Sequence, residues 1–233
     1  MQRTFNSIDW NESNQVPCEI LRGTDANNKL TELGLDITSE LQHAFRLSNS
    51  GYAIRKKKNP GRAMGRWGDI CEHADTILEP FGWSLIRKNG QPCLVNSKKN
   101  LQLIFMSPND EAFGNELSII TSKCHKGHAT ELKLLANKSH YADENFFRTF
   151  IVYYQPSNLI DTENSSFLPF EIAYATGIYK VSSEGEKTKC YPINHTLRLI
   201  MSDSLDAPEA YEAPIPDENN PITEDDFGDL QAI

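Results

Sequence analysis

The residues best suited to chemistry in this sequence form a basic run that leads into an aromatic side chain. The run places six cations within twelve residues and ends beside Trp67: Arg55, Lys56, Lys57, Lys58, Arg62 and Arg66. Lys88 adds positive charge on the hairpin that follows. Cationic side chains neutralise phosphates and release counterions, and aromatic rings stack on unpaired bases. The pattern predicts a nucleic-acid-binding surface, whereas the alternative interpretation is a solvated loop that only improves solubility.

Two tryptophans close to this run are candidates for a stacking ring. Trp67 follows the basic run directly, and Trp83 precedes the hairpin that carries Lys88. Trp67 also falls on the apolar stripe of a predicted helix, which favours packing in the core. Either tryptophan could therefore supply the ring, and the sequence does not choose between them.

The charge of the chain is unevenly distributed. The formal net charge is −9, but residues 203–233 hold ten acidic residues and no lysine or arginine, while residues 55–99 hold ten basic and four acidic residues. The acidic end also contains four prolines and scattered apolar residues, a composition that predicts disorder. In composition, residues 203–233 resemble the acidic C-terminal tails of single-stranded-DNA-binding proteins. This resemblance implies a flexible tail that regulates nucleic-acid binding or recruits a protein partner.

A second set of residues suggests a different function, metal-dependent phosphodiester cleavage. Asp110 follows a predicted hairpin, and Glu131 and Lys133 have the spacing acid-x-Lys. The order resembles that of restriction-endonuclease-like nucleases, in which two strand-borne carboxylates hold Mg²⁺ and a lysine stabilises developing charge. The chain departs from this pattern because the residues before Glu131 do not form an apolar strand. A third hypothesis is an interaction or inhibitory protein whose acidic tail mimics DNA.

Other signatures of catalysis are missing from the sequence. It contains no phosphate-binding glycine loop, no nucleophile elbow and no His-Glu-x-x-His pair. The five cysteines are scattered without a Cys-x-x-Cys pair, which fits reduced thiols better than disulfides or a zinc ribbon. We therefore expect a binding protein rather than an enzyme, with no cofactor and no metal site.

The elements that must position these residues follow from periodicity and turn signals. Helices are expected from Ser39 to about Gly51 and over 65–78, separated by an exposed basic loop at 55–62. Residues 124–136 are ambiguous between helix and strand, and we favour helix. Strands are expected near 83–86, 92–95, 101–105, 117–122, 147–154, 170–181 and 191–201.

These elements predict an α+β fold. We expect two N-terminal helices followed by a largely antiparallel sheet of six or seven strands, with residues 1–202 as a single body and 203–233 as a disordered tail. No apolar run approaches the ~20 residues of a membrane span, and the first twenty residues lack the apolar core of a secretory signal. A cytoplasmic protein that does not contact membranes is the resulting expectation.

Overall fold

A computed structural model describes nine stretches of the chain: residues 18–58, 65–88, 91–109, 113–115, 120–121, 128–139, 147–155, 168–178 and 193–201. The N-terminal elements in this part of the chain are β1 (Glu19–Arg22), α1 (Gly23–Glu32), α2 (Thr38–Lys58), α3 (Gly65–Leu78) and the 3-10 turn η3 (Glu79–Phe81). They are followed by β2 (Ser84–Lys88), β3 (Gln91–Asn96), β4 (Leu101–Met106), α4 (His128–Ser139), β5 (Arg148–Tyr154), β6 (Phe170–Ile178) and β7 (Ile193–Met201).

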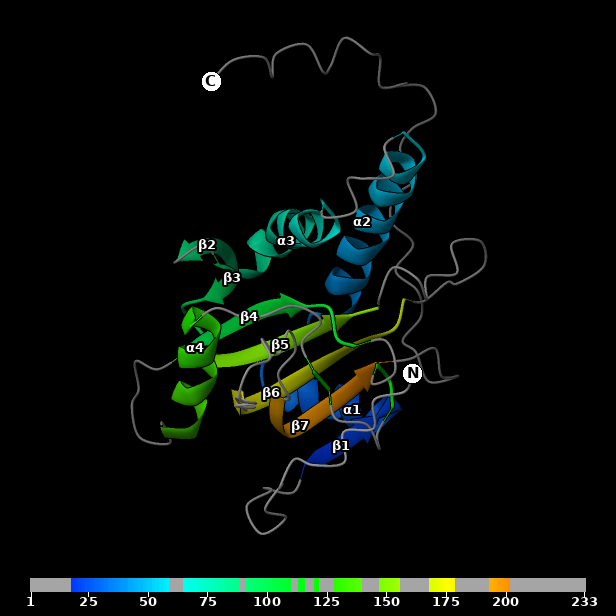
Figure 1. Ribbon diagram of the computed structural model, residues 1–233. Helices are drawn as coiled ribbons and strands as arrows, with labels where there is room; N and C mark the ends of the chain where they lie inside the picture. Colours follow the sequence, from blue (N-terminus) through cyan, green and yellow to red (C-terminus); the bar gives the residue numbers. More distant parts are fainter. Residues whose placement is uncertain are drawn as a thin grey trace, which may run out of the picture.

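The strands form one mixed sheet of seven strands, in the order β1-β7-β6-β5-β4-β3-β2 (Figure 1). Four of the six pairings are antiparallel, whereas β1 runs parallel to β7 and β4 runs parallel to β5. Parallel neighbours need a crossover connection, and α4 lies in the one between β4 and β5. The α+β class, the number of strands and the majority of antiparallel pairings agree with the sequence-based expectation, whereas the two parallel pairings that make the sheet mixed were not expected.

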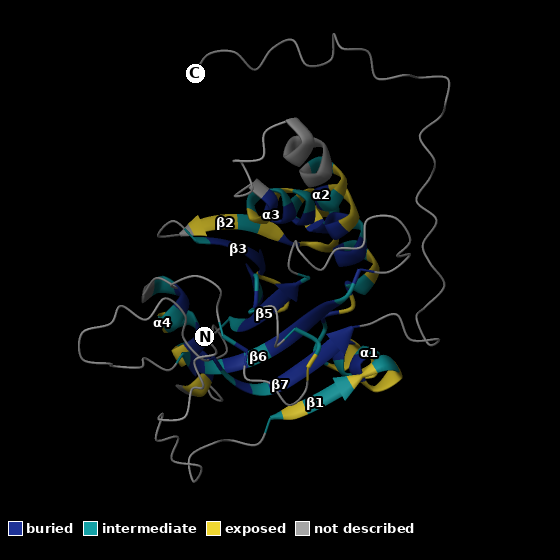
Figure 2. Ribbon diagram, turned by 45° about the vertical axis from the view of Figure 1, so that its right-hand side comes forward, coloured by how far each residue is buried: buried dark blue, intermediate teal, exposed yellow. Residues whose placement is uncertain are grey.

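Each face of the sheet carries its own apolar core, and the strands between the cores are mostly buried (Figure 2). Helices α1, α2 and α3 cover one face, where Phe45 packs on Phe105 and Phe170 with ring centroids 6.5 and 5.5 Å apart. On the other face, Leu134 of α4 joins a cluster that includes Ile104 and several other strand residues. Alternate residues of a strand point to opposite faces, which is why Ile104 and Phe105 enter different cores.

Helix α2 extends further than its sequence suggests. We expected it to end near Gly51 and residues 55–62 to form a loop, but the helix continues to Lys58. The expectation of a loop is therefore wrong for residues 55–58. Arginine and lysine have high helix propensity, and cations near a helix C-terminus interact favourably with its dipole, so both effects offset the repulsion between neighbouring like charges.

Helix α3 protects the edge of the sheet formed by β2. Its Asp75 Oδ1 accepts a hydrogen bond of 2.7 Å from the Leu85 backbone N–H, and one turn earlier its Glu72 lies 3.6 Å from the Arg87 guanidinium. A free strand edge invites pairing with other chains unless its backbone groups are occupied or covered. The periodic apolar face of α3 is thus bound to the core while its acidic face shields β2.

Asn137, a buried side chain of helix α4, forms hydrogen bonds with two strands of the sheet. Its Nδ2 donates to the Thr149 and Ala175 carbonyls at 2.8 and 2.7 Å, and its Oδ1 accepts from the Thr149 N–H at 3.0 Å. Regular pairing of β5 with β6 begins one residue further on, at Phe150 and Tyr174. Asn137 therefore replaces the ladder hydrogen bonds where β6 becomes irregular, and the preference for helix over strand in this region is confirmed.

Several expectations fall partly or wholly outside the described residues. Of the expected strand at 117–122, the structure describes only Ile120 and Thr121. Thr121 forms two hydrogen bonds with Asn109, one in each direction. Residues 203–233 lie outside the described stretches, as does Arg62. Strand β1 and helix α1 were not expected from the sequence. They add a strand and a third helix before the β2–β3 hairpin. None of the described helices is both long and apolar enough to cross a membrane.

Candidate functional site

The main candidate site is the C-terminal turn of α2, residues 55–58, which we call the basic end. All four residues are cations, and successive residues are rotated by about 100° around a helix axis, so their backbone positions encircle the helix. Helix α2 extends past α3 on the side away from the sheet (Figure 1). The fold therefore places four consecutive cations at a projecting end of the body.

Arg66, which was expected to contact phosphate, has a different role. Its side chain is buried, its Nε donates to Asn49 Oδ1 at 2.9 Å, and its Nη1 donates to the Gln155 carbonyl at 2.5 Å. The guanidinium also lies 5.1 Å from the centre of the Tyr154 ring. These contacts join the start of α3 to α2 and to the end of β5, so the guanidinium is not available to a phosphate. The sequence could not show this, because Asn49 lies 17 residues from Arg66 and Gln155 lies 89 residues from it.

The two candidate stacking rings differ sharply in exposure. Trp83 is 1% exposed and packs in the core beneath α1–α3, which excludes it from stacking on a base. Trp67 is 37% exposed, and its indole N–H donates to the Phe105 carbonyl at 3.0 Å. Of the two rings, Trp67 is the one that reaches solvent, at the junction where Arg66 joins α3 to its neighbours.

The residues assigned to a nuclease do not form the expected arrangement. Glu131 and Lys133 lie on α4 rather than on a strand, and the Lys133 ammonium donates to Cys93 Sγ at 3.0 Å. Asp110 lies outside the described residues. Within the described stretches, no group of three or more His, Cys, Asp or Glu side chains is placed to hold a metal ion. The strand-borne acid-x-Lys arrangement is therefore wrong for Glu131 and Lys133.

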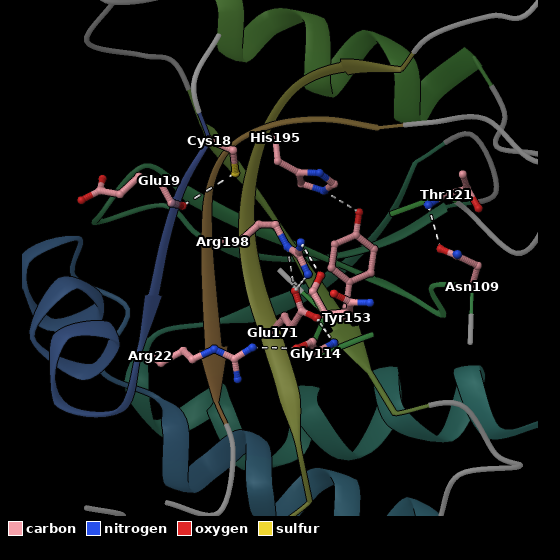
Figure 3. Close-up of polar contacts among 11 residues, drawn as sticks. Cys18, Glu19, Arg22, Asn109, Gly114, Thr121, Tyr153, Glu171, His195 and Arg198 are labelled. Carbon is pink, nitrogen blue, oxygen red and sulfur yellow. Dashed lines mark hydrogen bonds and ion pairs between the residues drawn. The ribbon is translucent and has the colours of Figure 1, made fainter. Parts of the chain in front are cut away.

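A buried polar cluster lies on the same face of the sheet as α4 and was not anticipated from the sequence (Figure 3). Arg198 of β7 donates from Nε and Nη2 to Glu171 Oε2 of β6 at 3.1 and 2.9 Å, with both side chains almost fully buried. The remaining groups hold a short segment: Arg198 Nη1 donates to the Asn115 carbonyl at 3.0 Å, and Glu171 Oε1 accepts from the Gly114 N–H at 2.6 Å. Arg22 donates to the Gly114 carbonyl at 2.7 Å, so the ion pair and β1 together clamp residues 114–115 onto the sheet.

A neighbouring pair in this cluster is electrically neutral at physiological pH. The Tyr153 hydroxyl and His195 Nε2 lie 3.0 Å apart in a hydrogen bond (Figure 3). Burial, followed by the nearby Arg198 charge, lowers the pKa of His195 to about 3, and burial raises the pKa of Tyr153 well above its usual value. Neither group exchanges a proton near neutral pH, so the pair has the properties of a structural contact rather than an acid–base couple.

The cluster left a single trace in the sequence: Glu171 is an acidic residue inside an otherwise apolar strand, which predicts a buried partner. Its partner Arg198 is 27 residues away and could be identified only once β6 and β7 were paired.

Comparison with family models, with curated proteins and with solved structures finds no match for this chain. The geometry of its own residues is therefore the basis for a functional assignment.

Proposed function

We propose that this protein is a non-catalytic nucleic-acid-binding protein that contacts phosphates through the basic end of α2, with the acidic residues 203–233 regulating this binding or recruiting a partner. The observation that carries the proposal is the placement of four consecutive cations, Arg55 to Lys58, on the projecting end of a 21-residue helix. A helix rises 1.5 Å per residue, so these charges follow one another every ~1.5 Å along its axis. Cations at this density neutralise phosphates and release condensed counterions, which supplies affinity that does not depend on sequence.

The contacts of other basic residues concentrate the proposed interface on this helix end. Arg66 is buried, Arg87 lies beside Glu72, and the Lys99 ammonium donates to the Gly34 carbonyl at 2.9 Å. These side chains have partners within the fold. The cations proposed to bind nucleic acid are therefore those of residues 55–58, together with Arg62 and Lys88 from the sequence-based prediction.

The acidic residues 203–233 supply the proposed regulation. They carry ten carboxylates and no cation, and they are tethered to the last strand of the sheet. A tethered polyanion has a high effective concentration near a basic surface of the same molecule and competes with nucleic acid for it. Removing the tail is therefore expected to strengthen binding.

The test compares nucleic-acid affinity at several salt concentrations for three proteins: the full chain, a triple variant (K56A, K57A, K58A) and a chain ending at residue 202. A matched control removes three lysines from separate places, Lys29, Lys98 and Lys138, by substitution with alanine. The triple variant should bind more weakly, and its plot of log affinity against log salt should be shallower by about 2 to 3, since each phosphate contact contributes ~0.7–0.9 to the slope.

The control should retain most of the affinity, and the truncated chain should bind more tightly than the full chain. An unchanged affinity and salt slope in the triple variant would refute the assignment of the basic end. Equal losses in the triple variant and in the control would show a diffuse charge effect instead of a site.

A further inference from the structure

Trp67 occupies an unusual position for a residue on an apolar helical stripe. Its neighbours at the next turn, Ile70 and Cys71, are buried, whereas Trp67 lies at the open start of α3 and is 37% exposed. The hydrogen bond of 3.0 Å from its indole N–H to the Phe105 carbonyl fixes the ring at the end of β4. The polar edge of the ring is satisfied inside the protein, and the exposed part of Trp67 is left in contact with solvent.

The residue after Trp67 is a glycine with space for a side chain. A side-chain atom built on Gly68, the next residue, would meet nothing within 4 Å. Glycine inside a helix costs up to ~1 kcal/mol relative to alanine. The described neighbours leave room for a side chain at residue 68, so their packing does not require a glycine there. A small side chain at residue 68 is therefore compatible with the described fold.

The spacing between this ring and the basic end is fixed by Arg66. Through its 2.9 Å hydrogen bond to Asn49 and its contacts with β5, Arg66 holds the first turn of α3 against a defined point of α2. Lys56 follows Asn49 by seven residues on the same helix, which is a rise of about 10 Å. The first turn of α3, which carries Trp67, is therefore attached to α2 about two helical turns before the basic end.

We propose that Trp67 stacks on an unpaired base, and that the ligand of this protein is a single strand whose phosphates contact the basic end of α2. This inference rests on the proposed function and narrows it to a class of nucleic acid. Bases in a duplex are already stacked and paired, so an exposed ring that is fixed at its polar edge favours strands with free bases. DNA and RNA single strands share this chemistry, and the experiment separates them.

The experiment measures affinity for four oligonucleotides of equal length: oligo(dT), oligo(U), an abasic DNA strand and a DNA duplex. The abasic strand retains the phosphates and lacks the stacking partner. The variants are Trp67→Leu, which removes the aromatic ring, Trp67→Tyr, which retains one, and Phe81→Leu, which removes an exposed aromatic ring outside the site. Both substitutions of Trp67 remove the hydrogen bond to the Phe105 carbonyl. Circular dichroism is therefore used to check that each variant is folded.

Trp67→Leu should weaken binding of the preferred single strand by about fivefold to hundredfold and leave the abasic strand unaffected, as expected for the loss of one stacked base. Trp67→Tyr should recover most of the affinity, Phe81→Leu should change nothing, and tryptophan fluorescence should be quenched by oligonucleotide in the wild type. Wild-type affinity of Trp67→Leu for both single strands would overturn the stacking site while leaving phosphate binding intact. A wild-type protein that binds none of the four ligands, including the abasic strand, would refute the proposed function and the stacking site together.

Discussion

The ion pair between Arg198 and Glu171 offers the sharpest test of the energetics of the fold. In Arg198→Met the carboxylate of Glu171, which is 0% exposed, loses both hydrogen bonds to Oε2 and retains the Gly114 N–H. Removing one partner of a buried pair leaves an uncompensated charge, which costs about 3–5 kcal/mol. The Asn115 carbonyl loses a donor as well, and this places the expected loss in the upper half of that range.

A double-mutant cycle separates the ion pair from other effects of the substitution. Glu171→Leu should also be strongly destabilising, because it leaves the Arg198 guanidinium buried without its carboxylate. The double variant, Arg198→Met with Glu171→Leu, contains neither charge, so its loss should be smaller than the sum of the two single losses by at least ~2 kcal/mol.

Urea unfolding followed by circular dichroism, with linear extrapolation to water, measures each free energy of unfolding. The reasoning would be refuted by a loss below ~1 kcal/mol in Arg198→Met. Single losses that simply add in the double variant would refute it equally, since independent residues would then account for the data.

Three further predictions follow from single residues. Asn137→Ala should lower the free energy of unfolding by about 2–3 kcal/mol, because it orphans buried groups of Thr149 and Ala175, and a change below ~0.5 kcal/mol in urea unfolding would contradict this. His195 is neutral in the folded state and protonates more easily when unfolded, so stability should fall as the pH drops from 6.5 towards about 3; His195→Gln should flatten this dependence, and an equally steep profile in the variant would count against it. Gly68→Ala should raise the melting temperature, with a gain of about 0.5–1 kcal/mol, because alanine favours the helix and meets no neighbour within 4 Å; a destabilised variant would show that the space is occupied.

The parts of the fold that the sequence predicted well are those with local signals. The apolar residues of α3 recur at helical spacing and Pro80 follows, so both ends of that helix were predicted at Gly65 and Leu78. Strand β5 is dense in β-branched and aromatic residues, and the observed bounds of β4 to β7 lie within three residues of the prediction. Periodicity and composition act over a few residues, and these elements require nothing more.

The parts that were missed depend on contacts between distant residues. Strand β1 has only four residues and is defined by its parallel pairing with β7, while α1 contains few apolar residues and is buried through Ala26 and Leu30. The continuation of α2 beyond Gly51 agrees with the high helix propensity of Arg55 to Lys58, which the glycine before them does not override.

The same distinction applies to the candidate site. The run of cations was visible in the sequence because it is local, although its helical conformation was not. The burial of Arg66 and the pairing of Arg198 with Glu171 required knowledge of which elements become neighbours. Charge in a sequence therefore shows where cations are concentrated, and the fold decides which of them reach solvent.

The parallel pairing of β1 with β7 also constrains how this chain can fold during its synthesis. Residues 19–22 leave the ribosome early, but their partners at 197–200 appear only about 175 residues later. At a translation rate of ~5–20 residues per second, the first strand waits roughly 10–40 s for its place in the sheet. Until then its polar backbone groups have no sheet to join, and nascent chains interrupted before residue 197 expose the flank of β6. The pairing of β1 with β7 can therefore form only after the residues between these two strands have been synthesised.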